Sequence, residues 1–267
     1  METSVANPAD ARVVRSLREP SVIARQRMLS QRGEPLLLAA WERALMIHFE
    51  VDAERLQRDV PFPLDLWNGQ AFVSLVAFTM RGMRPRLGGK LVAMLLRPIA
   101  THEFLNVRTY VRHGDECGIH FLAEWLPNRL AVRLGPATFG LPYRYGRIVY
   151  KHDGRKGRIQ GRVTDAGNHA RLAYHADLIA PATFQRCLAG SRAEWLMERY
   201  IAFNAAGRRK RYFRVWHPPW PQCAAEVSLE ETTLLTIPWP WFEQACQVGA
   251  NFSPGFDEVW MGWPRGC

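Results

Sequence analysis

The chain has 267 residues, 48% of them hydrophobic, and carries a formal net charge of +10 at neutral pH. This apolar fraction excludes a disordered polypeptide and suffices for one sizeable core. We therefore predict a single domain, residues 35–267, that follows an N-terminal extension, residues 1–34. The extension repeats arginine without an apolar stripe, so it is predicted to be partly helical or flexible, and a basic arm for an acidic partner is the alternative.

The composition also indicates where the protein resides. The cysteine count is odd, five, and no pair has C-x-x-C spacing, which does not fit a secreted disulfide framework. The N-terminus lacks the apolar core of a signal peptide, and no apolar run approaches the ~20 residues of a membrane span. We expect a cytoplasmic protein without a membrane contact. Its arginine-rich surface would suit acidic metabolites or phosphates.

The first half of the domain contains two strands and a helix. Residues 44–50 alternate in polarity and predict a strand, after which Asp52 is predicted to cap a helix over residues 53–60. Residues 71–80 are nearly all apolar, which indicates a strand covered on both faces. Residues 81–100 contain several glycines and a proline, so we expect a loop or flap there.

Residues 106–112 and 118–126 predict a β-hairpin, because both alternate in polarity around a His113-Gly114-Asp115 turn. The polar face of the first strand consists of Asn106, Arg108, Tyr110 and Arg112. In the second strand one predicted face consists of Ile119, Phe121, Ala123 and Trp125. Its opposite face consists of His120, Leu122, Glu124 and Leu126.

The second half is predicted to be mostly strands with two helices. Residues 128–139 favour a short helix, which Gly135-Pro136 is expected to break, and Ser191 is predicted to cap a helix that continues to about Asn204. The expected strands are residues 143–151, 158–163, 171–177, 211–216, 225–232 and 258–262. Strands and helices do not alternate regularly, so the pattern does not predict a parallel nucleotide-binding sheet. We predict a β-rich α+β fold, mostly an antiparallel barrel or closed double sheet with a small-molecule cavity.

Five stretches in the same order resemble the YqjF-like family, domain of unknown function 2071. They are residues 68–78, Asn106-Val107-Arg108-Thr109-Tyr110-Val111, Phe139-Gly140-Leu141-Pro142-Tyr143, Glu198-Arg199-Tyr200 and His217-Pro218-Pro219-Trp220-Pro221. The resemblance spans about residues 41–264. It implies the acetoacetate decarboxylase-like fold, an antiparallel β-barrel or β-cone with an enclosed pocket and a few peripheral helices.

The resemblance also exposes a substitution. Acetoacetate decarboxylases carry a Tyr-Pro-Lys-Lys turn in which one lysine forms a Schiff base with the keto acid. The matching stretch here is Leu141-Pro142-Tyr143-Arg144. Neither Tyr143 nor Arg144 can form a Schiff base, because that step needs a neutral primary amine. We therefore expect the pocket without the decarboxylase chemistry, and no cofactor.

The leading functional prediction is a small-molecule-binding domain, and the sequence leaves open whether it is an enzyme. Its ligand would be a small acidic or carbonyl-bearing metabolite. Five side chains are predicted to bind it: Asn106, Arg108, Tyr110, His120 and Arg144. The catalytic candidates are Tyr143 as a proton donor and Glu124 as a general base, with Arg108 or Arg144 holding a carboxylate. The alternative is that this face meets solvent, or that Arg108 and Glu124 form a structural pair.

Other functional predictions have less support from the sequence. His113, Cys117 and His120 have ligand types but irregular spacing, so no metal site is predicted. A lyase that uses a relocated lysine such as Lys151 is the enzymatic alternative, and a regulatory module is the noncatalytic one. The tryptophans near prolines fit cavity walls better than a nucleic-acid surface. Assembly into a homo-oligomer stays open.

Overall fold

The computed structural model describes residues 19–267 except residues 180–182 and 208. Its strands are β1 (Leu37–Val51), β2 (Ala71–Pro85), β3 (His102–His113), β4 (Glu116–Leu126), β5 (Tyr143–Asp153), β6 (Arg158–Asp165), β7 (Arg171–Leu178), β8 (Ile201–Ala206), β9 (Arg209–Trp216), β10 (Cys223–Glu231), β11 (Cys246–Met261) and β12 (Arg265–Gly266). The helices are α2 (Pro20–Leu29), α3 (Ala53–Asp59), α4 (Gly89–Leu96), η1 (Arg97–Ile99), α5 (Arg129–Phe139), α6 (Arg192–Met197), α7 (Thr233–Thr236) and η2 (Pro240–Gln244). This confirms the β-rich α+β class with a few helices. None of the helices in the described ranges is long and apolar enough to cross a membrane.

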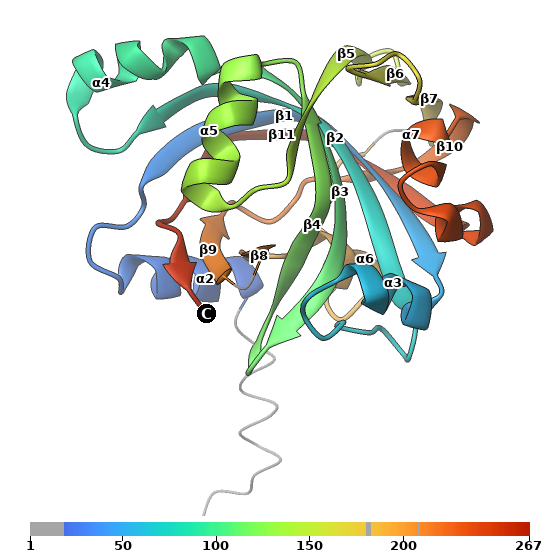
Figure 1. Ribbon diagram of the computed structural model, residues 1–267, viewed down its shortest axis with the longest axis horizontal. Helices are drawn as coiled ribbons and strands as arrows, with labels where there is room; N and C mark the ends of the chain where they lie inside the picture. Colours follow the sequence, from blue (N-terminus) through green and yellow to red (C-terminus); the bar gives the residue numbers. More distant parts are fainter. Residues whose placement is uncertain (1–18, 180–182, 208) are drawn as a thin grey trace, which may run out of the picture.

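One sheet connects all twelve strands in the order β12-β9-β8-β4-β3-β2-β1-β11-β10-β7-β6-β5. Two further pairings, β4 with β5 and β9 with β11, connect the ends of this order to its middle. Consequently β4 has β3 along one edge, and β8 and β5 in succession along the other. Figure 1 shows the long strands β1 to β4 through the centre, with α4 and α5 toward one end and α3 and α6 toward the other.

The long strands are apolar on both faces, and two cores form against them. Leu45, Ile47 and Phe49 of β1 enter one core, which also contains the buried residues of β6 and β7. Ala44 and Met46 of the same strand enter the other core. This explains why the strand predicted at residues 71–80 has almost no polar positions: Ala71 to Met80 are all buried.

Local signals predicted several elements correctly. Asp52 caps α3, since its carboxylate accepts a hydrogen bond from the Arg55 amide at 2.8 Å. Ser191 caps α6 in the same way, accepting from the Glu194 amide at 3.2 Å. The hairpin of β3 and β4 is also confirmed.

The helix expected from Ser191 to about Asn204 is wrong in its second half. It ends at Met197, and residues 201–206 form β8, which pairs with β4 and β9. Leu196, Tyr200 and Phe203 have the spacing of the apolar face of a helix, which led to the wrong prediction. In fact Ile201 and Phe203 enter one core while Ala202 enters the other, so the segment gains burial on both faces as a strand.

Two other expectations need correction. The predicted loop at 81–100 contains the end of β2, α4 and η1, because the apolar run from Leu91 to Leu96 forms a helical turn after Gly88 and Gly89. The predicted break at Gly135-Pro136 does not occur, and α5 continues through Pro136 to Phe139. A proline there removes one N–H from the helix without ending it.

The predicted faces of β4 are wrong because this strand contains a bulge. The register to β3 shifts after Phe121: Arg108 pairs with Phe121, and Val107 pairs with Ala123. Ile119 and Phe121 therefore lie in one core, whereas Ala123 and Trp125 lie in the other. As a result His120 and Glu124 do not share a face.

Candidate functional site

A cavity of about 450 Å³ lies between α5, the strands β2 and β3 and the C-terminal segment. Its walls are mainly aliphatic and aromatic, for example Leu96, Phe104 and Leu141. The polar side chains on its wall are His102, Thr138 and Tyr143, and no Lys, Arg, Asp or Glu from the described part of the chain lines it. Thr138 already donates its hydroxyl to the Leu134 carbonyl at 2.8 Å. His102 and Tyr143 are thus the side chains best placed to orient a ligand.

Tyr143 reaches the cavity because of how β5 begins. The turn after α5 brings Tyr143 beside Glu124 of β4 as its parallel partner, and the Glu124 amide donates to the Pro142 carbonyl at 3.1 Å. The Tyr143 ring packs 5.8 Å from the Phe104 ring. Burial, and secondly the nearby Glu124 carboxyl, raise the pKa of Tyr143 well above its usual 10. Its phenol therefore keeps its proton and acts as a hydrogen-bond donor.

Glu124 is a buried acid behind Tyr143. It is only 4% exposed, and its Oε2 has no hydrogen-bond partner among the described residues. Burial raises its pKa well above the usual 4.5, which favours the protonated carboxyl. Asn106 is its cross-strand partner on β3, and the Asn106 Oδ1 likewise has no partner in the described chain. Asn106 and Tyr143 are thus both strand neighbours of Glu124.

His102 was not predicted. It is 6% exposed, and neither of its ring nitrogens has a hydrogen-bond partner in the described part of the protein. Burial lowers its pKa to about 4, so the imidazole is neutral at neutral pH. The sequence did contain a signal for His102. The alternation of β3 continues from Asn106 through Phe104 to His102, so His102 lies on the same face of the strand as Asn106.

Arg108 and Tyr110 share that face but lie in a buried network that reaches none of the cavities described here. Arg108 donates to the Leu196 carbonyl at 3.2 Å, and the Tyr110 hydroxyl donates to the same carbonyl at 3.0 Å. Ser74 bridges Tyr110 at 2.6 Å and His48 Nδ1 at 2.7 Å. Since a carbonyl only accepts, the proton order that satisfies all these contacts runs from His48 through Ser74 and Tyr110 to Leu196.

That proton order bears on nucleophilic catalysis. A serine nucleophile needs a histidine that takes its proton. Here His48 donates to Ser74, and burial, followed by the charge of Arg108, lowers the pKa of His48 to about 3. The contact therefore supports α6 on the sheet and does not activate Ser74.

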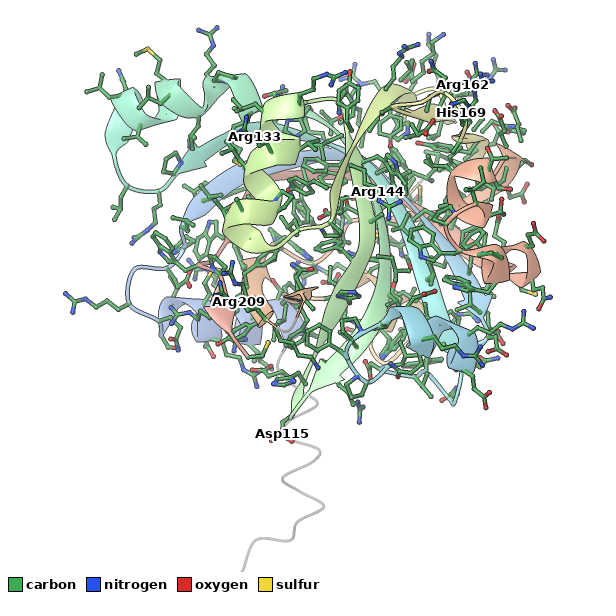
Figure 2. All side chains as sticks on the ribbon, in the orientation of Figure 1. Asp115, Arg133, Arg144, Arg162, His169 and Arg209 are labelled. Carbon is green, nitrogen blue, oxygen red and sulfur yellow. The ribbon has the colours of Figure 1, made fainter. Side chains whose placement is uncertain are left out.

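His120 and Arg144, also predicted to bind the ligand, lie on the other side of β4. The His120 ring packs 5.6 Å from Phe62 in the opposite core. Arg144 is exposed, and its guanidinium lies over the rings of Trp125 at 5.2 Å and Trp239 at 5.8 Å. Figure 2 shows Arg144 well apart from the other labelled arginines on α5, β6 and β9, so the positive charge is spread over the fold. Neither side chain contributes to the cavity beside Tyr143.

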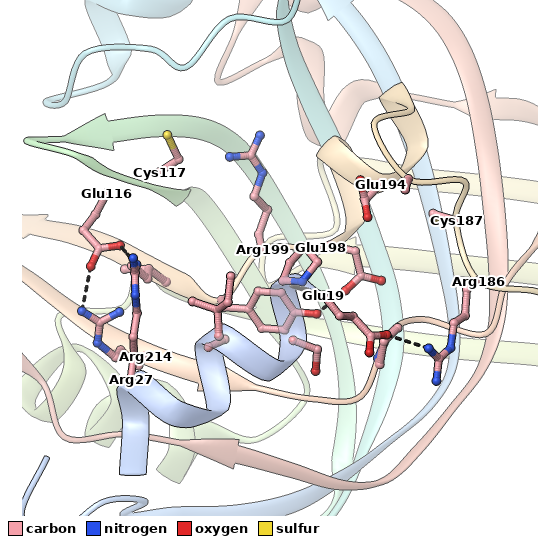
Figure 3. A pocket seen from close by; sticks show the side chains of 18 of the residues that line it. Glu19, Arg27, Glu116, Cys117, Arg186, Cys187, Glu194, Glu198, Arg199 and Arg214 are labelled. Atoms are coloured by element: carbon pink, nitrogen blue, oxygen red, sulfur yellow. Dashed lines mark hydrogen bonds and ion pairs between the residues drawn. The ribbon is translucent and has the colours of Figure 1, made fainter. Parts of the chain in front are cut away.

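A larger cavity, about 870 Å³, lies beside α2 and has charged side chains on its wall. Figure 3 shows that its charges pair with one another. Glu116 binds Arg27 at 2.7 Å and Arg214 at 2.9 Å, and Glu19 binds Arg186 at 2.7 Å. A ligand would have to displace these pairs, so we do not assign the site to this cavity. Within the described ranges no three His, Cys, Asp or Glu side chains group as a metal site.

Comparison with solved structures defines the class of protein. The fold is similar to acetoacetate decarboxylase from Legionella pneumophila, with 12% identity, a TM-score of 0.61, and coverage of 99% of this chain and 98% of that one. An acetoacetate decarboxylase-like enzyme from Sphingomonas wittichii RW1 gives 16% identity and a TM-score of 0.58, over 88% and 94% of the two chains. The enduracididine biosynthesis enzyme MppR complexed with pyruvate gives 13% and 0.56, over 89% and 92%. The chain therefore has the acetoacetate decarboxylase-like fold.

Sequence comparison identifies the family to which the chain belongs. The chain is 29% identical over 205 residues to the uncharacterized protein YqjF of Bacillus subtilis (strain 168), covering 74% of this chain and 80% of YqjF. Residues 38–238 match the family DUF2071, described as an uncharacterized conserved protein. The chain belongs to the DUF2071 family, as the sequence resemblance implied.

Proposed function

We propose that the protein binds a small, mostly apolar compound with a neutral carbonyl group in the cavity beside Tyr143. The observation that carries this proposal is the cavity lining, which is apolar except for His102, Thr138 and Tyr143. A carboxylate placed there would lose its hydration without gaining a cation. A ketone, aldehyde or ester needs only a hydrogen-bond donor, which Tyr143 supplies. MppR, a protein of the same fold, has been solved in complex with pyruvate, and the ligand proposed here keeps the ketone of pyruvate without its carboxylate.

The binding mode is noncovalent. By the sequence resemblance, Tyr143 matches the Schiff-base lysine of the decarboxylases, and a phenol forms no Schiff base. Its high pKa makes it a donor to the ligand carbonyl, while the raised pKa of Glu124 favours an uncharged carboxyl behind it. A protonated Glu124 is a proton donor and not the general base that the sequence suggested. The His102 ring, which also lines the cavity, has a lowered pKa and adds no charge to it near pH 7.

Isothermal titration with 4-phenyl-2-butanone and with 3-phenylpropanoate tests this proposal. We expect the ketone to bind and the carboxylate of similar size to bind far more weakly. Tyr143→Phe should weaken ketone binding by about 10-fold, the effect of one hydrogen bond. Tyr145→Phe, on the same strand but outside the cavity lining, is the matched control and should bind as the native chain does. A folded protein that ignores the ketone, or prefers the carboxylate, would exclude the proposal.

A further inference from the structure

The helix α4 is apolar, yet it lies on the surface. Its sequence is Gly-Lys-Leu-Val-Ala-Met-Leu-Leu, and none of its residues is buried. Five large apolar side chains on it and just before it are between 38% and 75% exposed: Leu87, Leu91, Val92, Met94 and Leu95. Single exposed apolar residues are common on proteins, whereas a cluster of this kind indicates an interaction surface.

This cluster continues onto α5. In Figure 1 α4 lies at the outer edge of the fold, at the end where α5 also lies. The Asn128 side chain, which caps α5, donates to the Pro98 carbonyl of η1 at 2.7 Å, so the start of α5 lies against the segment that follows α4. Leu130 and Leu134 of α5 are exposed as well. Leu134 and Leu96 also line the cavity beside Tyr143, so the exposed cluster borders that cavity.

Positive charge surrounds the apolar cluster. Residues 81–100 contain no Asp or Glu, and their five cations are all exposed: Arg81, Arg84, Arg86, Lys90 and Arg97. Arg81 pairs with Glu42 of β1, and the other four have no ion-pair partner among the residues that the structure describes. Arg133 of α5, labelled in Figure 2, is a further exposed cation at this end of the fold. The surface thus combines apolar side chains with uncompensated positive charge.

The charges distinguish between the partners that could cover this surface. A symmetric contact with a second copy presents the same patch to itself, so the cations of two copies would face each other without an acid between them. A groove on another protein takes one stripe of a helix, whereas successive residues of α4 point about 100° apart and its exposed side chains face several directions. An anionic lipid surface offers negative headgroups together with an apolar layer around the helix.

We infer that residues 81–97 dock the protein on an anionic membrane surface. The apolar side chains of α4 enter the boundary between headgroups and acyl chains, and the surrounding cations contact the lipid phosphates. The expectation of no membrane contact was drawn from the lack of a spanning run, which a helix that lies on the surface does not need. Docking brings the border of the cavity at Leu96 and Leu134 to the lipid, but it does not depend on the ligand proposed for that cavity.

Co-sedimentation with lipid vesicles tests the inference without any ketone present. The probe is a vesicle of phosphatidylcholine with about 30% phosphatidylglycerol, and vesicles of phosphatidylcholine alone are the control. We expect the native chain to bind the anionic vesicles, and to bind them less when NaCl is raised from about 0.1 M to about 0.5 M, because salt screens the headgroup charge. No binding to the anionic vesicles, or equal binding to both kinds, would overturn the inference.

Leu91→Ser/Leu95→Ser tests the apolar contribution. Because both leucines are exposed, the variant should keep the native Tm, while its binding to anionic vesicles should fall at least ~10-fold. Leu188→Ser/Ile237→Ser changes two exposed apolar residues elsewhere and is the matched control. Undiminished vesicle binding by the folded Leu91→Ser/Leu95→Ser protein would contradict the assignment. A native dimer that this variant converts into a monomer, measured by light scattering, would assign the surface to a second copy instead.

Lys90→Gln/Arg97→Gln tests the charge contribution. Each cation close to an anionic surface strengthens binding several-fold, so the double variant should bind anionic vesicles about 10-fold more weakly. Arg55→Gln/Arg58→Gln removes two exposed cations from α3, toward the other end of the fold (Figure 1), and should bind as the native chain does. Equal losses in the two double variants would show that the net charge of the protein, and not this surface, governs binding, which would overturn the inference.

Discussion

Gly135 of α5 lies directly against the ring of Tyr143: a Cβ at Gly135 would be 2.3 Å from the Tyr143 Cδ2 and Cε2 atoms. A glycine inside a helix costs about 1 kcal/mol relative to alanine. α5 contains this glycine, next to Pro136, at the position where a larger residue would overlap the Tyr143 ring. The poor helix formers Gly135 and Pro136 thus lie beside the side chain that we propose binds the ligand.

Gly135→Ala should disturb the site more than the helix. The methyl group forces the Tyr143 ring to move, at about 1–3 kcal/mol for overpacking, against a gain of about 1 kcal/mol in helix propensity. We expect a small net loss in the free energy of unfolding and weaker binding of 4-phenyl-2-butanone, measured by chemical denaturation and titration. Gly266→Ala is the control, since a Cβ there meets nothing within 4 Å. A more stable Gly135→Ala protein with native affinity would contradict the account.

Glu124→Gln should make the protein relatively more stable at alkaline pH. Because burial raises the folded pKa of Glu124, the unfolded chain releases its proton first, so stability is greatest below the unfolded value and falls as pH rises through the folded value. Glutamine removes that dependence. The difference in Tm between variant and native protein should therefore grow from pH 4.5 to pH 8. Glu226→Gln, exposed on β10, should show no such trend, and a constant difference for Glu124→Gln would refute a protonated Glu124.

His102→Phe should reduce acid sensitivity. The folded pKa of about 4 lies below the ordinary histidine pKa of 6.5, so the unfolded chain binds the proton first and native stability falls as pH drops through this window. Between pH 7.5 and pH 5 this histidine should account for about 2 kcal/mol of lost stability, at 1.36 kcal/mol per pKa unit. Urea titrations at both pH values measure it. Identical losses in His102→Phe and native protein would show that His102 is not buried in its neutral form.

Lys151 should form no covalent adduct with a keto acid. Lys151 is exposed on β5 and lies outside the cavity beside Tyr143, so it lacks the burial that makes an amine a Schiff-base nucleophile. Borohydride reduction in the presence of pyruvate, followed by peptide mass spectrometry, checks this. Labelling at Lys151 that disappears in Lys151→Arg would instead support the lyase alternative.

The fold was predictable wherever the signal was local. The Asp52 and Ser191 caps and the hairpin turn at Gly114 depend on neighbouring residues, and each was confirmed. β8 was mistaken for helix because its two-sided burial depends on β4, β9 and both cores, which are distant in sequence. The bulge after Phe121 leaves no mark in a pattern of alternating residues.

The candidate site, too, was predictable only where the signal was local. Asn106 lies opposite Glu124 through the predicted hairpin, whereas Tyr143 reaches Glu124 through a parallel pairing of β4 with β5 that the sequence did not predict. The bulge moves His120 to the other face, and α6 covers Arg108 and Tyr110, so none of these lines the apolar cavity. Tertiary contacts determine where these side chains lie, and the spacing of residues in the sequence does not reveal such contacts.

The hydrogen bond from Tyr143 to a ligand carbonyl is the central claim, and isotope-edited infrared spectroscopy of carbonyl-labelled 4-phenyl-2-butanone measures it. In the native protein the carbonyl stretch should shift to lower frequency than in an alkane solvent. In Tyr143→Phe the bound ketone should return to the alkane value, while Tyr145→Phe keeps the native shift. A bound ketone whose carbonyl frequency is the same in the native and Tyr143→Phe proteins would contradict the account.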